Sequence, residues 1–473
     1  MLLKKNSLLA TYFWLTAYLF IFLLSFPFIN RLNSLFYLFL ILYWFIFVVL
    51  VYYVLQISKE LDFTKLILLV SFLIGLILNL TSQISLSDDL YRYFFDGFLA
   101  IHGLNPYLVA PDNPSSSAIT SLFPFLNKIN NPTVTSPYPP LMILISFIFV
   151  LIFGYNILMW LLLTNLVIII TGFILSRTFR MLNLNPNYII LFFNPLVLLT
   201  FNHSGHNDAM ALLSVVCSIF LLAKAETIEA KTTKNLFLIV AGCFLALGIG
   251  IKLFPIFFVP FLLKKLKIGI LFTGILTIFQ ALIYLVLINI RSTGLVIFLE
   301  NWRGNGGLFE LVYYIFNNFD SYTYNRTLQM EIRFIFTSLF IVIFSLLILS
   351  YYMTRESNEN NKRGFIHLFH FIGLSFIVLF ILSPVLHPWY VLWSIIPFII
   401  SVDKRFYPYW VLLFFNSFTY YYYLDSVFIP FFILVEYIVF YSSLFFYFRK
   451  NLVKVLIKRV NYISMRISKG EYV

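Results

Sequence analysis

Long apolar segments follow one another along the whole chain and are separated by short polar connectors. Most of them approach the ~20 residues that an α-helix needs to cross the hydrocarbon core of a bilayer. Backbone groups in lipid must be hydrogen-bonded within their own segment, so each segment is predicted to be a helix. The predicted spans are 8–28, 35–55, 66–83, 156–176, 188–202, 208–224, 235–250, 253–263, 269–290, 334–353, 365–383, 389–402, 407–424 and 428–448. The pattern predicts an all-α polytopic membrane protein with roughly 12 to 14 spans.

The placement of basic residues orients the chain in the membrane. With the N-terminus inside, most of the 32 Lys and Arg residues fall on the inner side of these spans, as the positive-inside rule requires. This holds only if the apolar segment 141–153, which is short for a span, stays outside as a re-entrant or membrane-surface half-helix. The equally short segment 253–263 must cross, because the loops after it otherwise break the charge rule.

A single transmembrane domain, residues 1–448, is therefore predicted, with two substantial outer loops at 84–140 and 291–333. After this domain, residues 449–473 alternate basic and apolar positions at helical spacing. Such a segment is typical of an amphipathic helix that lies on an anionic inner leaflet. Membrane lipids are thus expected partners of the chain.

The composition supports this assignment and narrows the choice of partners. The chain is 61% hydrophobic with a mean hydropathy of +0.94, whereas soluble domains are about half apolar. Orientation in the membrane accounts for the net charge of +13, so nucleic acid is not expected as a partner. The richness in Phe, Ile, Asn and Lys is typical of an AT-rich bacterial genome, and we expect a multi-pass protein of the bacterial plasma membrane.

The start of the first outer loop carries the strongest signal of chemistry. Asp88, Asp89, Arg92 and Asp96 place three carboxylates and a guanidinium within nine residues, directly after an apolar run. Only 11% of the chain is charged, and charges beside a membrane are costly unless they serve a function. We interpret this stretch as part of an active site that faces the outer side.

The outer location limits the reactions that such a site could catalyse. ATP and nucleotide sugars are not at hand outside the cytoplasm, so an activated group has to arrive on a lipid, for example as a lipid-linked phosphosugar. Its transfer requires a carboxylate that accepts the proton of an acceptor hydroxyl, and Asp88 and Asp89 are the candidates. Cations must also stabilise the leaving phosphate. The candidates for this role are Arg92, Lys252, Arg303 and His387.

A second set of polar residues could bind sugar hydroxyls or a divalent metal. The residues proposed for either role are Asp96, His206 and Asp208. If a metal such as Mg or Mn is used, its candidate ligands are Asp88, Asp89, His206 and Asp208.

Most candidates also have a structural interpretation, and Asp96-Gly97, for example, could be an ordinary helix end with a glycine. Asp88 or Asp89 could cap the helix that follows them, and Lys252 could extend along the membrane interface. His206 and Asp208 could form a hydrogen-bonded turn. Other segments with structural alternatives are the turn at Asn105-Pro106, the chain direction set by Tyr138-Pro139-Pro140, and an aromatic anchor at His387-Pro388-Trp389-Tyr390.

Short motifs occur in a recognisable order between residues 80 and 395. They are the acidic pair 88–89, Tyr91-Arg92-Tyr93, Asp96-Gly97, Gly103-Leu104-Asn105-Pro106-Tyr107, Tyr138-Pro139-Pro140-Leu141, Asn194-Pro195, Gly205-His206-Asn207-Asp208, Lys252-Leu253-Phe254-Pro255 and His387-Pro388-Trp389-Tyr390. In this order they resemble the GT-C superfamily and are similar to the bacterial polyprenyl-phosphate-mannose-dependent mannosyltransferases. Phe95 stands where that group usually has Trp.

The resemblance implies a GT-C-like helix bundle with juxtamembrane helices in the first outer loop. It also implies a polyprenyl-phosphate sugar donor and inversion at the anomeric centre. By position it places the catalytic carboxylate at Asp88, with Asp89 as the second choice. Contacts to sugar or acceptor are implied for Asp96, Asn105, Tyr138, His206, Asn207, Asp208 and Trp389.

Together these features predict an integral-membrane glycosyltransferase. It would move a sugar, mannose by the resemblance, from a polyprenyl phosphate to a hydroxyl of a lipid-linked or glycolipid acceptor on the extracytoplasmic side. The alternatives are a transporter or flippase of lipid-linked sugars and a polymerase or ligase of lipid-linked glycans. Transporters commonly contain internal repeats and a site near the bilayer midplane, and the sequence indicates neither feature.

Overall fold

The computed structural model describes residues 2–57, 60–80, 84–288, 293–317, 325–354, 361–401, 407–423, 434–446 and Arg449. Within these residues the regular structure is helical, and the β pairing consists of an isolated bridge between Gly304 and Val385. The predicted amphipathic tail 449–473 lies outside the described residues except for Arg449.

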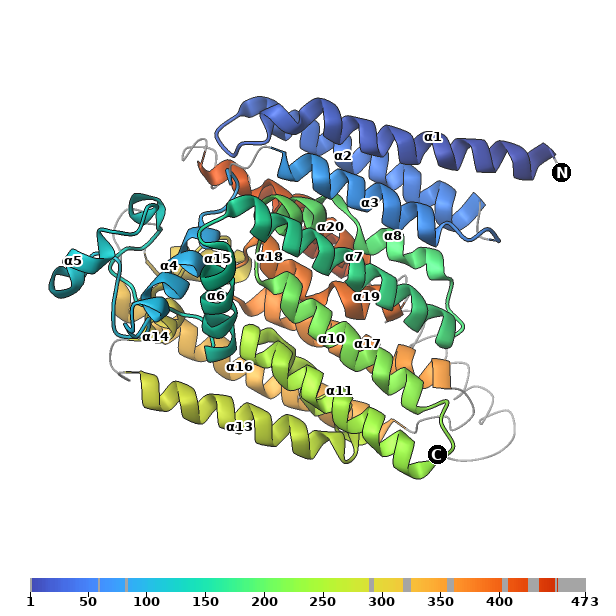
Figure 1. Ribbon diagram of the computed structural model, residues 1–473. Helices are drawn as coiled ribbons and strands as arrows, with labels where there is room; N and C mark the ends of the chain where they lie inside the picture. The colour runs from blue at the N-terminus through green and yellow to red at the C-terminus, as the bar shows by residue number, and fades with distance from the viewer. Residues whose placement is uncertain are drawn as a thin grey trace.

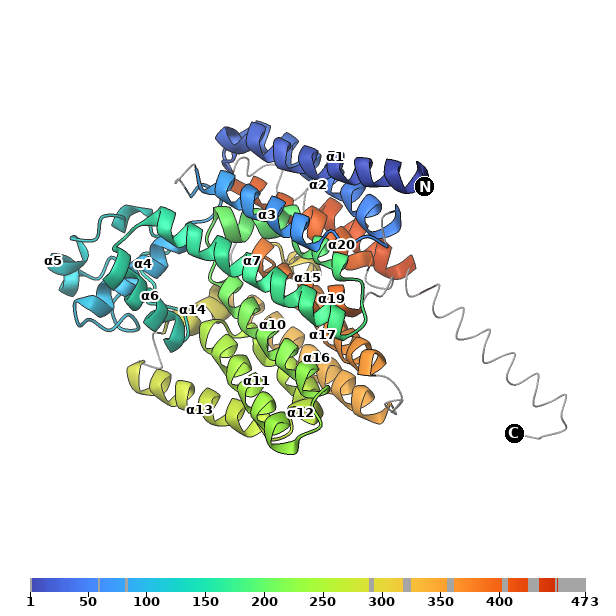
Figure 2. The same ribbon diagram turned by 45° about the vertical axis from the view of Figure 1, so that its right-hand side comes forward.

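The described residues contain eight helices that are long and apolar enough to cross a membrane. They are α1 (Leu2–Ser25), α2 (Ser34–Tyr52), α7 (Ile157–Met181), α10 (Asp208–Ala225), α11 (Lys231–Ile251), α13 (Gly269–Leu287), α16 (Arg326–Met353) and α17 (Asn361–Leu382). Figures 1 and 2 show them side by side with roughly aligned axes, as one bundle. The prediction of an all-α polytopic membrane protein is confirmed.

Shorter helices complete the bundle where the sequence predicts shorter spans. They are α3 (Thr64–Asn79), α12 (Val259–Leu266), α18 (Pro388–Val391), α19 (Ile395–Ser401), α20 (Tyr407–Asn416) and Leu434–Phe446. Several of them begin next to a proline or continue into a short 3₁₀ turn, because proline is tolerated in the first turn of a helix but not in its interior.

The predicted span 188–202 is interrupted. It begins as α8 (Ile189–Phe192), restarts as α9 (Pro195–Val197) and continues as a π-helix over Leu198–His203. The restart has a local cause: the proline of α9 cannot continue the first helix, and the Asn194 side chain accepts a hydrogen bond from the last N–H of α9. Short π-helical segments are frequent at functional sites, and this one leads directly into the connector 204–207.

The two ends of the bundle differ. One end, which we call the loop end, carries α4 (Asp89–Ile101), α5 (Ser117–Thr120), α6 (Pro140–Phe153), α14 (Gly294–Asn301) and α15 (Gly307–Phe316). The other end, which we call the lysine end, holds the short connectors that follow α7, α10, α12 and α16. In Figure 1 the loop end, with α4, α5, α6 and α14, is on the left.

The segment 141–153 stays at the loop end as part of α6. α6 packs on α4, where the Phe94 and Phe149 rings stack with centroids 5.7 Å apart. A β-carbon at Gly97 would lie 2.5 Å from the carbonyl oxygen of Ser146, so glycine allows the two helices to touch. Since α3 ends and α7 begins at the loop end, the whole stretch from 84 to 156 folds there.

The second outer loop is shorter than predicted. Helix α16 begins at Arg326, well before residue 334, because the side chain of Asn325 accepts a hydrogen bond from the N–H of Leu328. Arg333 also belongs to α16, and its Nη1 donates to the carbonyl oxygen of Leu299 in α14 at 2.7 Å. The first turns of α16 are polar, so the hydropathy pattern did not extend to its true start.

Candidate active site

Five segments meet at the loop end: the start of α4, the connector 204–207, the start of α10, the residue that follows α11 and the start of α18. They bring together Asp89, His206, Asp208, Lys252 and Trp389, which we call the polar cluster. His206 Nδ1 lies 3.5 Å from Asp89 Oδ2 and 4.0 Å from Asp208 Oδ2. The His206 ring stacks on the Trp389 ring with centroids 4.2 Å apart. Five residues predicted separately from the sequence are therefore neighbours.

Asp88 and Asp89 are adjacent in the chain but have different partners. Asp88 occupies the N-cap position of α4 without a side-chain capping bond, and its carboxylate pairs with Arg31 at 3.0 Å. Asp89 instead faces His206, and it accepts a weak hydrogen bond of 3.4 Å from Asn130 Nδ2. The sequence ranks Asp88 first as the base, but Asp89 is the carboxylate that belongs to the polar cluster.

Asp208 and Lys252 form a buried ion pair beside these groups. Asp208 has no exposed surface, and its Oδ2 lies 3.2 Å from Lys252 Nζ. Its other oxygen accepts a hydrogen bond of 2.5 Å from Trp393 Nε1. Lys252 follows the last residue of α11, and its ammonium also donates to Asn207 Oδ1 at 3.3 Å. The ammonium group of Lys252 thus lies within the polar cluster. These contacts do not indicate the alternative role, in which the side chain extends along the membrane interface.

Two tyrosines form one wall of the polar cluster. Tyr93 donates from its hydroxyl to Asn207 Oδ1 at 3.1 Å, and its ring packs edge-on against Tyr138 with centroids 5.1 Å apart. Lys252 Nζ lies 5.5 Å from the centre of the Tyr138 ring, within the range of a cation–π contact. Tyr138 and Asn207, both predicted to contact sugar or acceptor, therefore lie next to the buried ion pair.

His206 is buried without a hydrogen-bond partner for either ring nitrogen among the described residues. Burial lowers the pKa of His206 to about 3, and the charge of Lys252 acts in the same direction while Asp208 opposes it. The imidazole is therefore neutral at physiological pH. Because unpaired buried polar atoms are uncommon in proteins, this ring offers hydrogen-bonding capacity that a substrate could use.

His387 is oriented by a tryptophan from the second outer loop. Trp302 Nε1–H donates to His387 Nε2 at 2.9 Å, and the imidazole stacks on Trp389 with centroids 4.6 Å apart. Burial lowers the pKa of His387, so the ring is neutral and carries one hydrogen. Because Nε2 accepts the indole hydrogen bond, that hydrogen is on Nδ1. His387 is thus prepared to donate from Nδ1.

Arg92 and Asp96 hold the first outer loop rather than the polar cluster. The Arg92 guanidinium is buried and donates to the backbone carbonyl oxygens of Asn130, Asn131 and Val134 at 2.9–3.0 Å. Asp96 accepts a hydrogen bond of 2.7 Å from Ser136 Oγ, and burial raises the pKa of Asp96 to about 7. These contacts indicate structural roles, which differ from the predicted phosphate and sugar contacts.

Arg303 and Asn105 are also engaged with the protein. Arg303 Nε lies 2.8 Å from a Glu310 carboxylate oxygen, and its guanidinium stacks 3.7 Å from the centre of the Tyr313 ring. Asn105 Nδ2 donates to the carbonyl oxygen of Leu287 at 2.6 Å, which attaches the first outer loop to the end of α13. These contacts account for the positions of both side chains without any contact to the polar cluster.

The four candidate metal ligands do not form one ligand set. Among the described residues, no group of three or more His, Cys, Asp or Glu side chains is placed to hold an ion. Asp88 pairs with Arg31 and Asp208 pairs with Lys252, so two of the candidates already face cations. This arrangement does not fit a divalent ion.

Several residues of the site could not be found by reading motifs. Arg31 lies far from Asp88 in the sequence, and Trp302 is on a different loop from His387. Trp393, the hydrogen-bond donor to Asp208, follows Trp389 by one helical turn. That spacing is the only signal in the sequence that could have pointed to one of these residues.

Comparison with known protein families assigns the chain. Residues 37–266 match the model of the alpha-(1->6)-mannopyranosyltransferase N-terminal domain, named for the MptA/MptB family. Residues 335–445 match the MptB C-terminal domain. No curated protein and no solved structure matches the chain. The two family matches follow each other in order and include every member of the polar cluster. The chain therefore belongs to the MptA/MptB family of alpha-(1->6)-mannopyranosyltransferases and is a GT-C-type mannosyltransferase.

Proposed function

We propose that this enzyme takes mannose from a polyprenyl phosphate and transfers it to a hydroxyl of a lipid-linked or glycolipid acceptor on the extracytoplasmic side. The observation that carries the proposal is the position of Asp89. Its carboxylate is at the loop end, 3.5 Å from His206 and next to the Asp208–Lys252 pair. The alternatives of a transporter and of a polymerase or ligase lose their support, because the family is one of mannosyltransferases.

Asp89 acts as the general base in this proposal. It accepts the proton of the acceptor hydroxyl while the acceptor oxygen forms a bond to C1 of mannose. The bond between C1 and the phosphate oxygen breaks, and its electron pair leaves with the polyprenyl phosphate. Attack opposite the leaving phosphate inverts the anomeric centre. Asp88 is less suited to this step, because Arg31 Nη2 donates hydrogen bonds to both of its carboxylate oxygens.

Lys252 and His387 stabilise the leaving phosphate. Lys252 supplies a positive charge that it shares with buried Asp208, and His387 supplies the Nδ1–H donor that its bond from Trp302 leaves available. The two groups are close enough for the charge of Lys252 to influence the ionisation of His387. Donors fixed in advance around the site of developing charge are the largest source of catalysis in many enzymes.

The distribution of charge supports the proposed side of the membrane. The lysine end carries Lys264 and Lys265 in the last turn of α12 and Lys267 directly after it, together with the basic connectors of the other helices. By the positive-inside rule this end faces the cytoplasm. The polar cluster is at the opposite end, where a lipid-linked donor can arrive without a nucleotide.

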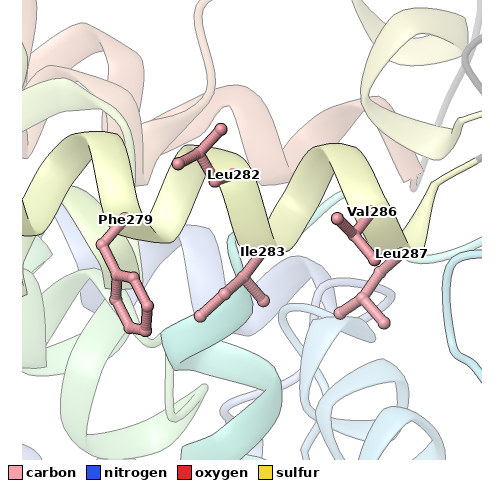
Figure 3. Close-up of a pocket in the computed structure, with 5 residues that line it drawn as sticks. All are labelled: Phe279, Leu282, Ile283, Val286 and Leu287. Atoms are coloured by element: carbon pink, nitrogen blue, oxygen red, sulfur yellow. The ribbon is translucent and has the colours of Figure 1, made fainter.

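The surface of α13 supports a lipid-linked donor. An open apolar groove with a volume of about 310 Å³ runs along this helix. Figure 3 shows the residues that line it, which are Phe279, Leu282, Ile283, Val286 and Leu287. The groove ends where Asn105 binds the last turn of α13. A polyprenyl chain in the groove would therefore lead toward the first outer loop, with its phosphate near the polar cluster.

The test uses purified enzyme and two matched variants, Asp89→Asn and Asp88→Asn. Each is incubated with short-chain polyprenyl-phosphate sugars and a membrane-lipid extract, and mass spectrometry follows released polyprenyl phosphate and mannosylated lipid. Loss of a general base typically costs about 10²–10⁴-fold in rate, and we expect that loss for Asp89→Asn with a much smaller loss for Asp88→Asn. Absence of release from every donor by the wild type, or full activity of Asp89→Asn, would overturn the proposal.

A further inference from the structure

Besides Asp208 and Asp96, another acidic side chain is buried at the loop end. Glu436, on the helix Leu434–Phe446, has no exposed surface, and the proposed reaction does not use it. A carboxylate removed from water is costly unless hydrogen bonds stabilise it. The hydrogen-bond partners of Glu436 indicate why an acidic residue is buried at this position.

Two asparagine amides bind the Glu436 carboxylate. Asn305 Nδ2 lies 3.2 and 3.5 Å from its two oxygens, and Asn416 Nδ2 donates to Oε1 at 3.3 Å. The same two amide nitrogens donate to the carbonyl oxygen of Leu386, at 3.2 and 3.1 Å. We call Glu436, Asn305 and Asn416 the amide clamp. It is attached to the residue immediately before His387.

The clamp also joins the two loops that carry Trp302 and His387. The N–H of Gly304 donates to the carbonyl oxygen of Pro384, and the N–H of Leu386 donates to that of Gly304, both at 3.1 Å. Asn305 adopts a φ of 54°, in the left-handed region that side-chain-bearing residues seldom occupy. Such backbone conformations persist where surrounding contacts enforce them and are common at functional sites. The contacts that enforce this one include the bonds to Glu436.

We propose that Glu436 is a positioning residue for mannosyl transfer: through the amide clamp it sets the loops that carry Trp302 and His387, and so the direction of the His387 Nδ1–H. This inference rests on the proposed function. From His387 the contact continues to Trp389, at 4.6 Å between ring centroids, and from Trp389 to His206, at 4.2 Å. The last described helix is thereby linked to the polar cluster.

A double-mutant cycle tests whether Glu436 acts through His387. Glu436→Gln keeps the size of the side chain but turns one acceptor oxygen into an N–H donor, which faces the donating amides of Asn305 and Asn416. Leaving buried donors unpaired should lower kcat/KM for the donor roughly ten-fold or more. In the His387→Ala background the same change should cost less than about two-fold, because coupled residues give non-additive effects.

A matched control lies on the same helix. The Tyr441 hydroxyl accepts a hydrogen bond of 3.0 Å from the N–H of Leu308, so it contacts the same loop outside the clamp. Tyr441→Phe should keep kcat/KM close to that of the wild type. If the effects of Glu436→Gln and His387→Ala multiply, or if Glu436→Gln matches Tyr441→Phe, the positioning role is wrong.

Hydrogen–deuterium exchange gives a readout that does not require activity. In Glu436→Gln we expect faster exchange in 302–306 and 384–390 together, since one clamp holds both segments. Tyr441→Phe should leave both segments protected. Unchanged exchange in Glu436→Gln would overturn the inference. If the wild type transfers no mannose from any donor, the proposed function fails, and the exchange result still decides whether the clamp orders these loops.

Discussion

The loop end and the lysine end of the bundle treat charge in opposite ways. At the loop end, Asp208 and Glu436 are fully buried, and Arg92 and Asp96 are nearly so. At the lysine end, the ion pair between Arg180 and Asp62 remains in water, with 37% and 54% of the side chains exposed. Both ends carry charged residues next to apolar helices, and hydropathy alone does not indicate which of these residues are buried.

This difference in burial indicates which charged residues are candidates for a function. Removing a charge from water costs several kcal/mol before its partners compensate, whereas an exposed pair contributes about 0–1 kcal/mol and is easily replaced. Charges at the lysine end are explained by the orientation of the chain in the membrane. Charges at the loop end have no such explanation, so their burial supports a role in catalysis or in positioning.

The largest expected effect on stability comes from Lys252. In Lys252→Met the buried carboxylate of Asp208 loses the cation 3.2 Å away, and breaking a buried pair typically costs about 3–5 kcal/mol of unfolding free energy. The matched change Arg180→Met breaks an exposed pair and should cost at most about 1 kcal/mol. Denaturant unfolding in one detergent measures both values. Equal losses would remove the distinction between the two ends.

His206 and His387 should add to stability as pH rises from 4 to 7, whereas Asp96, whose pKa burial raises to about 7, subtracts from stability over the same range. Burial lowers the pKa of His206 to about 3 and lowers that of His387 as well, whereas an unfolded histidine has a pKa of about 6.5. At these two histidines the unfolded state therefore binds more protons than the folded state over this range. Each of the two histidines adds up to ~1.4 kcal/mol per pH unit to stability as pH rises. Thermal unfolding of the wild type and of His206→Asn measures the slope. His206→Asn should gain less stability per pH unit than the wild type as pH rises through this range, and an unchanged slope would contradict the buried neutral state of His206.

A smaller effect is expected on the lipid-facing side of the loop end. Val286→Trp should obstruct the groove on α13 and raise KM for long-chain donors about three-fold, a modest change because the displaced chain moves only from protein to equally apolar lipid. KM for short-chain donors should not change. Val342 on α16 is also exposed, so Val342→Trp is the matched control. A similar rise in both variants would count against the groove as the site of the chain.

The smallest effect is expected from metal removal. Asp208 is paired with Lys252 and Asp88 with Arg31, so we expect transfer activity to be the same before and after dialysis against EDTA. An activity that is lost with EDTA and restored by Mg or Mn would require a different arrangement of the polar cluster.

Much of the fold could be predicted from hydropathy and charge alone. Apolar length predicts helices because a backbone in lipid has to satisfy its own hydrogen bonds. The polar start of α16 and the break in 188–202 were missed, although Asn325 and Asn194-Pro195 carry local signals for both. A hydropathy average over a stretch of residues does not detect a single capping residue. The structure identifies these caps by their hydrogen bonds.

The candidate site was predictable as a set of residues but not as an arrangement. Motif order pointed to Asp89, His206, Asp208, Lys252 and Trp389, and these residues lie together. Arg92 and Arg303 carry the same charge as Lys252, but their guanidinium groups bind partners outside the polar cluster. The residue type limits the roles that a side chain can have, and the contacts of the side chain indicate which of these roles it has.

The sequence by itself determined the helical membrane class and the family, because hydropathy and local motifs act over short stretches of chain. Only the tertiary structure distinguished the surroundings of Asp88 from those of Asp89, since their partners, Arg31 and His206, are 57 and 117 residues away along the chain. It also linked Glu436, from the last described helix, through the amides of Asn305 and Asn416 to Leu386, the residue before His387. Such contacts depend on how helices pack, and packing brings together residues whose separation in sequence carries no signal.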